Sequence, residues 1–228
     1  MIKSSRLRGG CADEASPLVR VTHLAAGAPP ISVYANDDRV PLVASLASRE
    51  STDYVEVSEE TSTLRITAAG ASPDAALLTL DDLSLFEDEE YTVVAFGTAD
   101  EGDEFPLEVE VLVDDVPDVA FGTVAVRPVH VAPGVGDVDV YAMDGVTPLL
   151  IADDLPSGAA ADYAVVPTTY DEIGIDLDDD GALEVRFPLD VAAPGVFWTA
   201  FVAMNDAGDP ILLAQARDST TFVQPAPQ

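Results

Sequence analysis

Apolar and polar residues alternate with a period of two along much of the chain. Residues 107–111 read apolar, acidic, apolar, acidic, apolar, and residues 54–57 and 137–141 alternate in the same way. A period of two places successive side chains on opposite faces of a β-strand. Helical periodicity is weak, and 77–85 is the one ambiguous stretch. The pattern therefore predicts an all-β chain.

The expected strands fall into two sets of seven. The first set is expected at 18–24, 31–36, 53–57, 63–68, 76–80, 91–97 and 107–113, and the second at 124–131, 137–142, 162–166, 172–177, 183–187, 196–203 and 211–217. Turn-forming residues separate the strands, for example at 27–30, 70–73 and 205–208. Seven short strands in about a hundred residues are typical of an antiparallel, Ig-like β-sandwich.

The two sets are copies of one unit. His23 and His130 are 107 residues apart, as are Tyr34 and Tyr141, and the segment 19–27 aligns with 126–134. Later matches shift by a few residues, as insertions in the loops between strands would produce. We therefore predict three regions: a flexible N-terminal segment (1–17), a first β-sandwich repeat (18–118) and a second β-sandwich repeat (119–228).

These residues resemble a known family. The opening segment 19–34, the segment 127–141 and the segment 112–115 are similar to the DUF4397 domain, whose function is unknown. The first copy departs from the family pattern by having Ser32 where an aspartate is usual. The resemblance implies tandem domains in an exported or lipid-anchored prokaryotic protein, and it implies no particular activity.

Charge narrows the set of partners. The chain has 42 acidic and 10 basic residues, a formal net charge of −32. Such a surface repels nucleic-acid phosphates and anionic lipid headgroups, so nucleic-acid binding is not expected. The acidity is compatible with a saline or marine habitat, in which cations screen the self-repulsion, and with a simple role in solubility. The apolar run at 196–204 is far shorter than the roughly 18 residues of a membrane helix, so no transmembrane segment is expected.

Cys11 is the single cysteine, which excludes an intramolecular disulfide. The sequence Gly-Gly-Cys-Ala-Asp at 9–13 is similar to the end of a bacterial lipoprotein signal, and a lipid on Cys11 would anchor the chain to a membrane. Only Ile2 and Leu7 are apolar before it, whereas an export signal needs an apolar stretch of about 7 to 15 residues. The alternative is a disordered tail with an exposed thiol.

His23 and His130 occupy the same position in the two copies, with Tyr34 and Tyr141 following on the next strand. A histidine could be a metal ligand or an acid–base group. No cysteine or second histidine lies nearby in the sequence to complete a metal set. We therefore interpret all four as structural signature residues, with each imidazole bonded to the turn that follows its strand.

The segment 176–181 is the sharpest local motif. Oxygen-bearing side chains occupy positions 1, 3 and 5 and a glycine occupies position 6, as in the first half of a calcium loop. Position 12 is Phe187 instead of an acid, and the flanking residues are strand-like, so the motif is not an EF-hand. The predicted Ca²⁺ ligands are Asp176, Asp178, Asp180 and Glu184. The alternative is an ordinary acidic turn.

The combined pattern favours a non-catalytic, exported protein of the cell surface or envelope that acts in structure, adhesion or protein binding. A calcium-dependent recognition module, for example for a glycan, is the alternative. The sequence has no nucleophile elbow, zinc-protease motif or phosphate loop. A hydrolase without a recognisable motif is a third alternative, because the many acidic residues could supply a pair of carboxylates of the kind that hydrolyses a glycosidic bond. The expected partners are extracellular proteins or glycans, and the oligomeric state is left open.

Overall fold

The computed structural model describes residues 16–98, 106–178, 180–188 and 197–225. Nearly all regular structure in these ranges is β-strand, and the helical exception among them is a 3₁₀ turn at Pro73–Ala75. The first repeat contains β1 (Leu18–His23), β2 (Ile31–Ala35), β3 (Val43–Leu46), β4 (Glu50–Ser51), β5 (Val55–Glu56), β6 (Leu64–Ala68), β7 (Leu78–Leu80), β8 (Glu90–Phe96) and β9 (Glu108–Val113). The second contains β10 (Thr123–His130), β11 (Val138–Met143), β12 (Pro148–Leu155), β13 (Ala159–Ala160), β14 (Ala164–Pro167), β15 (Glu172–Asp176), β16 (Val185–Pro188), β17 (Phe197–Met204) and β18 (Pro210–Ala216).

Each repeat is a pair of sheets with the same strand order. The inner sheets are ordered β4-β1-β8-β9 and β13-β10-β17-β18, and the outer sheets are β3-β2-β6-β7 and β12-β11-β15-β16. This confirms the all-β sandwich class. In each repeat of the described chain, however, one pair of strands is parallel: β1 runs parallel to β8, and β10 runs parallel to β17. Parallel neighbours need a long crossover, and the whole outer sheet lies within it. Alternation predicts which face of a strand is buried, but it does not predict the direction of the neighbouring strand.

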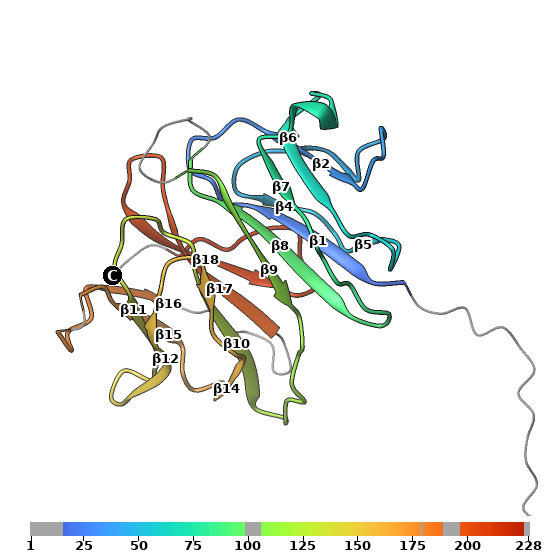
Figure 1. The fold of residues 1–228 in the computed structure, drawn as a ribbon. Helices are drawn as coiled ribbons and strands as arrows, with labels where there is room; N and C mark the ends of the chain where they lie inside the picture. The colour runs from blue at the N-terminus through green and yellow to red at the C-terminus, as the bar shows by residue number, and fades with distance from the viewer. Residues whose placement is uncertain (1–15, 99–105, 179, 189–196, 226–228) are drawn as a thin grey trace, which may run out of the picture.

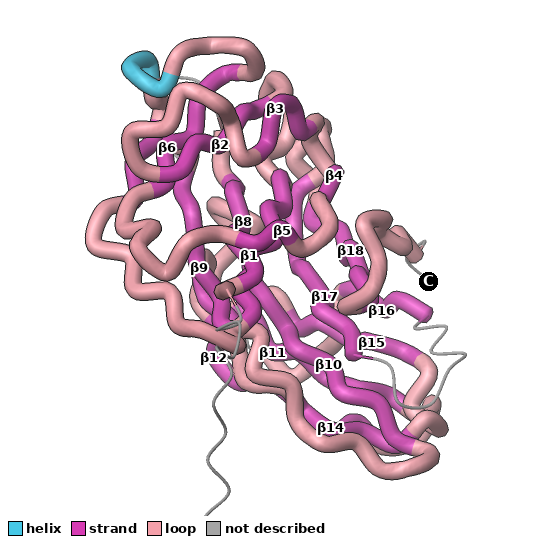
Figure 2. The backbone as a smooth tube through the Cα atoms, turned by 90° about the vertical axis from the view of Figure 1, so that its right-hand side faces the viewer, coloured by secondary structure: helices cyan, strands magenta, loops and turns pink. Residues whose placement is uncertain are grey.

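The four sheets stack in four layers, with the two inner sheets in the middle of the molecule (Figures 1 and 2). One apolar core fills each sandwich, around Val33 and Ile66 in the first repeat and around Val140 and Ile175 in the second. A third core lies between the inner sheets and joins the repeats. Its buried members are Leu24, Val94, Phe96, Leu112, Val129, Val131, Phe201, Ala203, Ile211 and Leu213.

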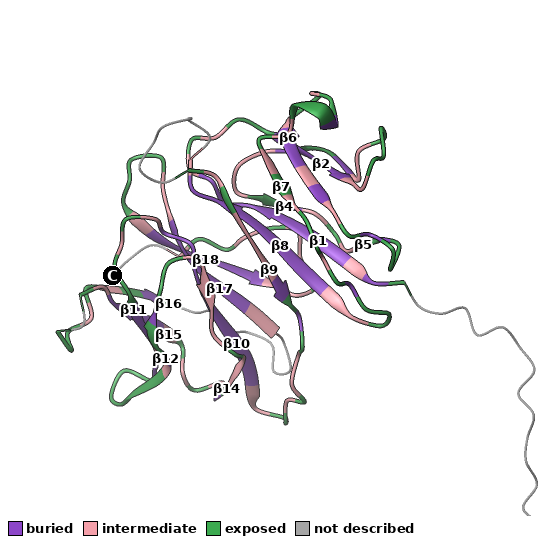
Figure 3. Ribbon diagram, in the orientation of Figure 1, coloured by how far each residue is buried: buried purple, intermediate pink, exposed green. Residues whose placement is uncertain are grey.

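This third core explains why β8 and β17 contain runs of consecutive apolar residues. In β8, Val93 and Ala95 face the sandwich core, whereas Val94 and Phe96 face the inter-repeat core. The central strands of the inner sheets are therefore buried on both faces (Figure 3). A strand buried on both sides loses the polar alternation of a solvent-facing strand.

Four strands were not predicted from the sequence. β4 and β13 have two residues each, too few to establish a period. β3 and β12 pair with their neighbours through register shifts, which interrupt the alternation that identifies a strand. β12 is also largely exposed although it begins with four successive apolar residues.

The N-terminal prediction falls almost entirely outside the described residues, because the structure describes the chain from residue 16. Cys11 and its interpretation as a lipid anchor therefore stay a prediction. β9 ends at Val113 and β10 begins at Thr123, so the predicted boundary between 118 and 119 falls in the connection between the repeats. Among the described residues no helix is long and apolar enough to cross a membrane.

Candidate functional site

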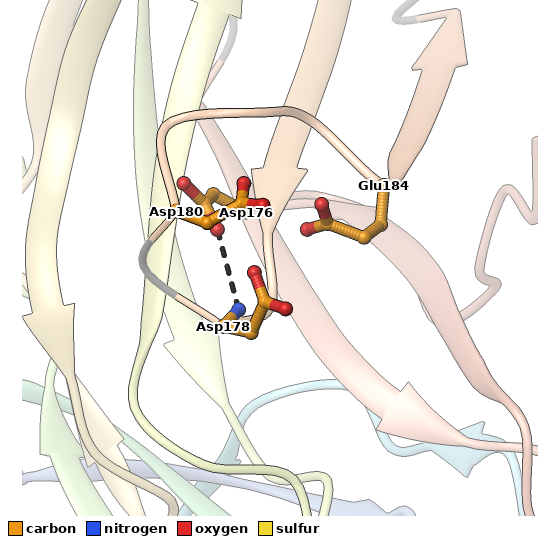
Figure 4. Close-up of side chains that lie close together, drawn as sticks. All are labelled: Asp176, Asp178, Asp180 and Glu184. Carbon is orange, nitrogen blue, oxygen red and sulfur yellow. Dashed lines mark hydrogen bonds between the residues drawn. The ribbon is translucent and has the colours of Figure 1, made fainter.

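The loop that joins β15 to β16 brings the four predicted calcium ligands together. Asp176 is the last residue of β15, Asp178 and Asp180 follow in the loop, and Glu184 immediately precedes β16. One carboxylate oxygen from each of the four lies within 4.8 Å of the other three. Figure 4 shows the side chains directed toward the space that the loop encloses.

Backbone N–H groups hold the loop in this shape. Asp176 Oδ1 accepts from the N–H of Asp178 at 3.2 Å, and its Oδ2 accepts from the N–H of Gly181 at 2.8 Å. Glu184 Oε2 accepts from the N–H of Leu177 at 2.7 Å, so the two ends of the loop are tied together. Gly181 has a φ of +82°, a conformation that side-chain-bearing residues rarely adopt. The glycine therefore permits the turn that returns the chain toward Glu184.

The electrostatics of this loop favour a bound cation. Asp176 is 1% exposed, whereas the other three acids are exposed. The neighbouring charge of Asp180 raises the pKa of Asp178, followed by smaller contributions from burial, Glu184 and Asp176. A cation placed among the four carboxylates would relieve this repulsion.

The spacing also suits calcium. Calcium–oxygen distances are about 2.4 Å, so two oxygens on one ion are at most about 4.8 Å apart. The four carboxylate oxygens satisfy this limit. Three of the four residues are exposed and can move a little to complete the coordination. The residues at these positions thus fit a hard, oxygen-seeking divalent cation.

The equivalent loop of the first repeat is built differently. It joins β6 to β7 through the 3₁₀ turn at Pro73–Ala75, which Ser72 caps by accepting from the N–H of Asp74. Asp74 forms an ion pair with Arg39 at 2.5 Å, and both side chains are largely exposed. The Arg39 hydrogen bond lowers the pKa of Asp74. An arginine of the β2–β3 loop therefore neutralises the acid of this loop, which does not collect carboxylates.

His23 and His130 are both fully buried at the ends of β1 and β10. Nε2 of His23 lies 3.2 Å from the carbonyl oxygen of Pro29, and Nε2 of His130 lies 3.0 Å from that of Gly136. A carbonyl only accepts, so each imidazole carries its proton on Nε2. Burial lowers the pKa of both residues. The two rings tie the first strand of each repeat to the turn that follows it.

Tyr34 and Tyr141 occupy matching positions but have different partners. The Tyr34 hydroxyl donates to the carbonyl oxygen of Ala71 at 2.8 Å, which anchors the β6–β7 loop. The Tyr141 hydroxyl donates to Asp139 Oδ2 at 3.1 Å. Burial, and then the bond to Asp139, raises the pKa of Tyr141.

A buried polar network joins the repeats and was not predicted from the sequence. Arg20 and Arg127 are equivalent residues that are 2% and 3% exposed. Each guanidinium lies 4.8 Å from the centre of a tyrosine ring, Tyr54 for Arg20 and Tyr163 for Arg127. Burial raises the pKa of both tyrosines. Both copies therefore contain the same pair of an arginine and a tyrosine.

Contacts across the network run from one repeat to the other. Arg127 of β10 pairs with Asp114 at 2.5 Å and donates to the carbonyl oxygen of Val113 at 3.0 Å. Asp114 also accepts from the hydroxyls of Thr92 and Tyr54, both at 2.6 Å.

Arg217 of the second repeat also pairs with Glu90 of β8 at 2.5 Å. Arg20 donates to the carbonyl oxygen of Arg217 at 3.2 Å. The sequence did contain a signal for these contacts. Arg20 and Arg127 match at an offset of 107 in a chain with only 10 basic residues, which is unusual for solvent-exposed positions.

The family model described as "Domain of unknown function (DUF4397)" matches residues 17–141, more than half of the chain. No curated protein matches the chain. A solved structure described as "Alpha-glucan binding by a streptococcal virulence factor" aligns with 85% of this chain and 94% of that chain, at 15% identity and a TM-score of 0.24. A similarity this low assigns no function.

Proposed function

Since the chain belongs to the DUF4397 family, we propose that it is a non-catalytic, exported protein of the cell surface or envelope that acts by binding. The observation that supports this role is that the buried polar side chains stabilise the fold. His23, His130 and the arginines of the inter-repeat network all hold strands, turns or repeats together. Exposed loops and sheet edges are then the surfaces available to a partner. The second repeat is, in this proposal, a second DUF4397 unit.

Export is tested by fractionating the native cells and detecting the chain with an antibody. The proposal expects the chain in the envelope or the medium, and expects external protease to degrade it on intact cells. A chain confined to the cytosol would overturn this part of the proposal. Lipid attachment is tested separately by mass spectrometry of the purified protein, in which a Cys11→Ser variant should lose the mass of the acyl groups.

The absence of catalysis is tested by screening the purified protein against glycoside, ester and peptide substrates. The proposal expects rates equal to those of buffer. A saturable hydrolytic activity that survives repurification, and that a single acidic substitution abolishes, would overturn it.

A calcium-binding role for the β15–β16 loop is the second candidate. The convergence of Asp176, Asp178, Asp180 and Glu184 on one space favours it. In this proposal the ion rigidifies the loop, and the loop then recognises an extracellular partner such as a glycan. A rigid loop loses less conformational entropy when it binds a partner.

The calcium role is tested by thermal unfolding with Ca²⁺ or with a chelator. A ligand that binds only the folded chain stabilises it by about 2.7 kcal/mol at a hundredfold excess over Kd. Calcium should therefore raise the Tm of the wild type but not that of Asp178→Ala. Asp171→Ala is a matched control, because Asp171 is exposed and precedes the same strand at its other end. Equal melting of the wild type with calcium and with chelator would contradict the proposal.

A further inference from the structure

Two grooves lie at equivalent places on opposite sides of the inter-repeat core. The first has a volume of about 520 Å³ and lies between residues 110–113 of β9 and residues 160–163 of the second repeat. The second has a volume of about 450 Å³ and lies between Leu213 of β18 and residues 49–51 of the first repeat. The C-terminal residues Thr220, Thr221, Phe222 and Gln224 line the second groove.

Strand pairing gives the correspondence between the grooves. Val93 of β8 pairs with Val111, and its equivalent in β17, Ala200, pairs with Ala214. Val111 therefore corresponds to Ala214, Glu110 to Leu213 and Leu112 to Gln215. Val111 and Ala214 are 103 positions apart, whereas His23 and His130 are 107 apart, so the two repeats differ in loop length before these strands. The structural correspondence makes the two grooves directly comparable.

The C-terminal tail extends the inner sheet of the second repeat. Val223 and Ala214 exchange two backbone hydrogen bonds of 2.8 Å, an antiparallel pairing on the outer side of β18. The ring of Phe222 packs edge-on against Phe201 with 6.0 Å between ring centres. The tail is thus a bound extended segment within the chain itself.

The outer side of β9 is the equivalent surface, and β9 is the last strand of its sheet within the described residues (Figure 1). The N–H of Asp114 donates to the carbonyl oxygen of Glu90 on β8 at 2.8 Å. Since backbone groups of an antiparallel strand alternate in direction, Val109, Val111 and Val113 direct theirs outward, away from β8. The carbonyl oxygen of Val113 already accepts from Arg127, so Val109 and Val111 are the part of this row that is a template for another strand.

The chemistry of the β9 groove differs from that of the occupied groove. Glu110 stands where Leu213 stands, and Asp115 and Asp162 also line the groove. Burial raises the pKa of Glu110, so a cation beside this carboxyl would stabilise its charged form. In the tail, Val223 pairs with Ala214, and Phe222 and Gln224 are the residues before and after Val223. Transferred to β9, these positions lie beside Leu112 and Glu110 respectively.

We propose that the groove beside β9 binds an extended segment of a partner protein, which adds to β9 as an antiparallel strand and places a basic side chain against Glu110. The segment carries an apolar residue two positions before the basic residue, so that the apolar side chain lies beside Leu112. Backbone bonds to Val111 supply affinity, and the two side chains supply specificity. The net charge of −32 also favours a basic partner. The inference rests on the proposed binding role, but not on calcium.

The probe is a fluorescein-labelled peptide with the sequence of residues 219–224 and the substitution Gln224→Lys, measured by fluorescence anisotropy in 150 mM KCl with EDTA. A second peptide carries Gln224→Glu, and a third carries N-methylvaline in place of Val223. We expect saturable binding of the lysine peptide and about tenfold weaker binding of the glutamate peptide, as close charge pairs produce at interfaces. The N-methyl peptide lacks a backbone donor and should not bind.

Variants of the protein locate the site. Glu110→Lys should reverse the preference between the lysine and glutamate peptides, and Glu110→Gln should abolish it. Glu59→Lys makes the same charge change at an exposed residue outside the groove and should leave the preference intact. Circular dichroism establishes that each variant is folded.

Absence of saturable binding, or a preference that Glu110→Lys and Glu110→Gln leave unchanged, would overturn the inference. The chelator separates this result from the calcium test. If the peptide binds in EDTA and calcium does not stabilise the chain, the calcium candidate is removed and the present inference stands. Loss of export would remove the cell-surface role without changing either binding result.

Discussion

The outer edges of the two inner sheets differ although the sheets themselves are built alike. The β18 edge is covered by the chain's own tail through Val223, whereas β9 is a terminal strand in the described part of the molecule. The buried arginines and histidines and the tyrosines beside the arginines, by contrast, occupy matching positions in both repeats. The comparison teaches that the two repeats share their buried scaffold, whereas their exposed edges and loops differ in chemistry.

The largest loss of stability is expected from a substitution where the two repeats meet. Asp114→Ala removes the carboxylate that pairs with Arg127, and the Asp114 side chain is 0% exposed. An uncompensated buried charge destabilises a protein by about 3 to 5 kcal/mol. Urea unfolding measures the change. Asp218→Ala is the control, because Asp218 is exposed, and exposed substitutions typically change stability by less than about 0.5 kcal/mol. Equal effects of the two substitutions would refute a role for Asp114 in joining the repeats.

A smaller loss of stability is expected when the C-terminal tail is detached from β18. Phe222→Ala removes the edge-on contact with Phe201 and part of the cover of the inter-repeat core. We expect a loss of about 1 to 2 kcal/mol from the aromatic pair and the exposed apolar area. Thermal unfolding measures it, and Phe86→Ala is the control because Phe86 is 62% exposed. A Phe222→Ala variant as stable as the wild type would mean that the tail does not hold the β18 edge.

The buried histidines predict a dependence on pH. Burial lowers their pKa in the folded chain, whereas the unfolded chain titrates near 6.5. Below about pH 6.5 the unfolded chain therefore binds more protons, and the free energy of unfolding falls as the pH falls. The double substitution His23→Gln and His130→Gln keeps a donor at each site but removes the titration. Between pH 7.5 and 5.5 the wild type should lose more stability than this variant, and parallel pH profiles would contradict the assignment.

Salt concentration should have the smallest effect on stability, and this effect does not arise at any single site. A net charge of −32 destabilises the compact chain through self-repulsion, which ions screen within about 10 Å at 0.1 M. The Tm should therefore rise between 10 mM and 1 M KCl, by several degrees. Because this repulsion is spread over both repeats, Asp178→Ala should leave the slope nearly unchanged. A Tm independent of salt would remove the argument for a saline habitat.

Much of the scaffold could be predicted from the sequence because strand alternation and turn residues are local signals. The two sets of strands, the repeat and the sandwich class follow from them. The Asp176–Glu184 loop could also be predicted, since ligand spacing within one hairpin is a local property. The structure brings these four acids within 4.8 Å of one another.

The matching positions of Arg20 and Arg127 are visible in the sequence, but their partners could not be predicted, because these depend on contacts between distant residues. Arg20 and Arg217 are 197 positions apart and Glu90 and Arg217 are 127 apart, yet each pair is joined by a hydrogen bond. The parallel pairing of β1 with β8 is also non-local. Strand pairing places Glu110 of β9 where β18 has Leu213, and the sequence alone does not give this correspondence.

Amide hydrogen exchange, followed residue by residue, tests the difference between the two sheet edges most directly. The N–H of Ala214 donates to the carbonyl oxygen of Val223, so it should be protected. The N–H of Val111 occupies the equivalent outward position on β9 and should exchange much faster. Equal protection of the two amides would contradict an open β9 edge.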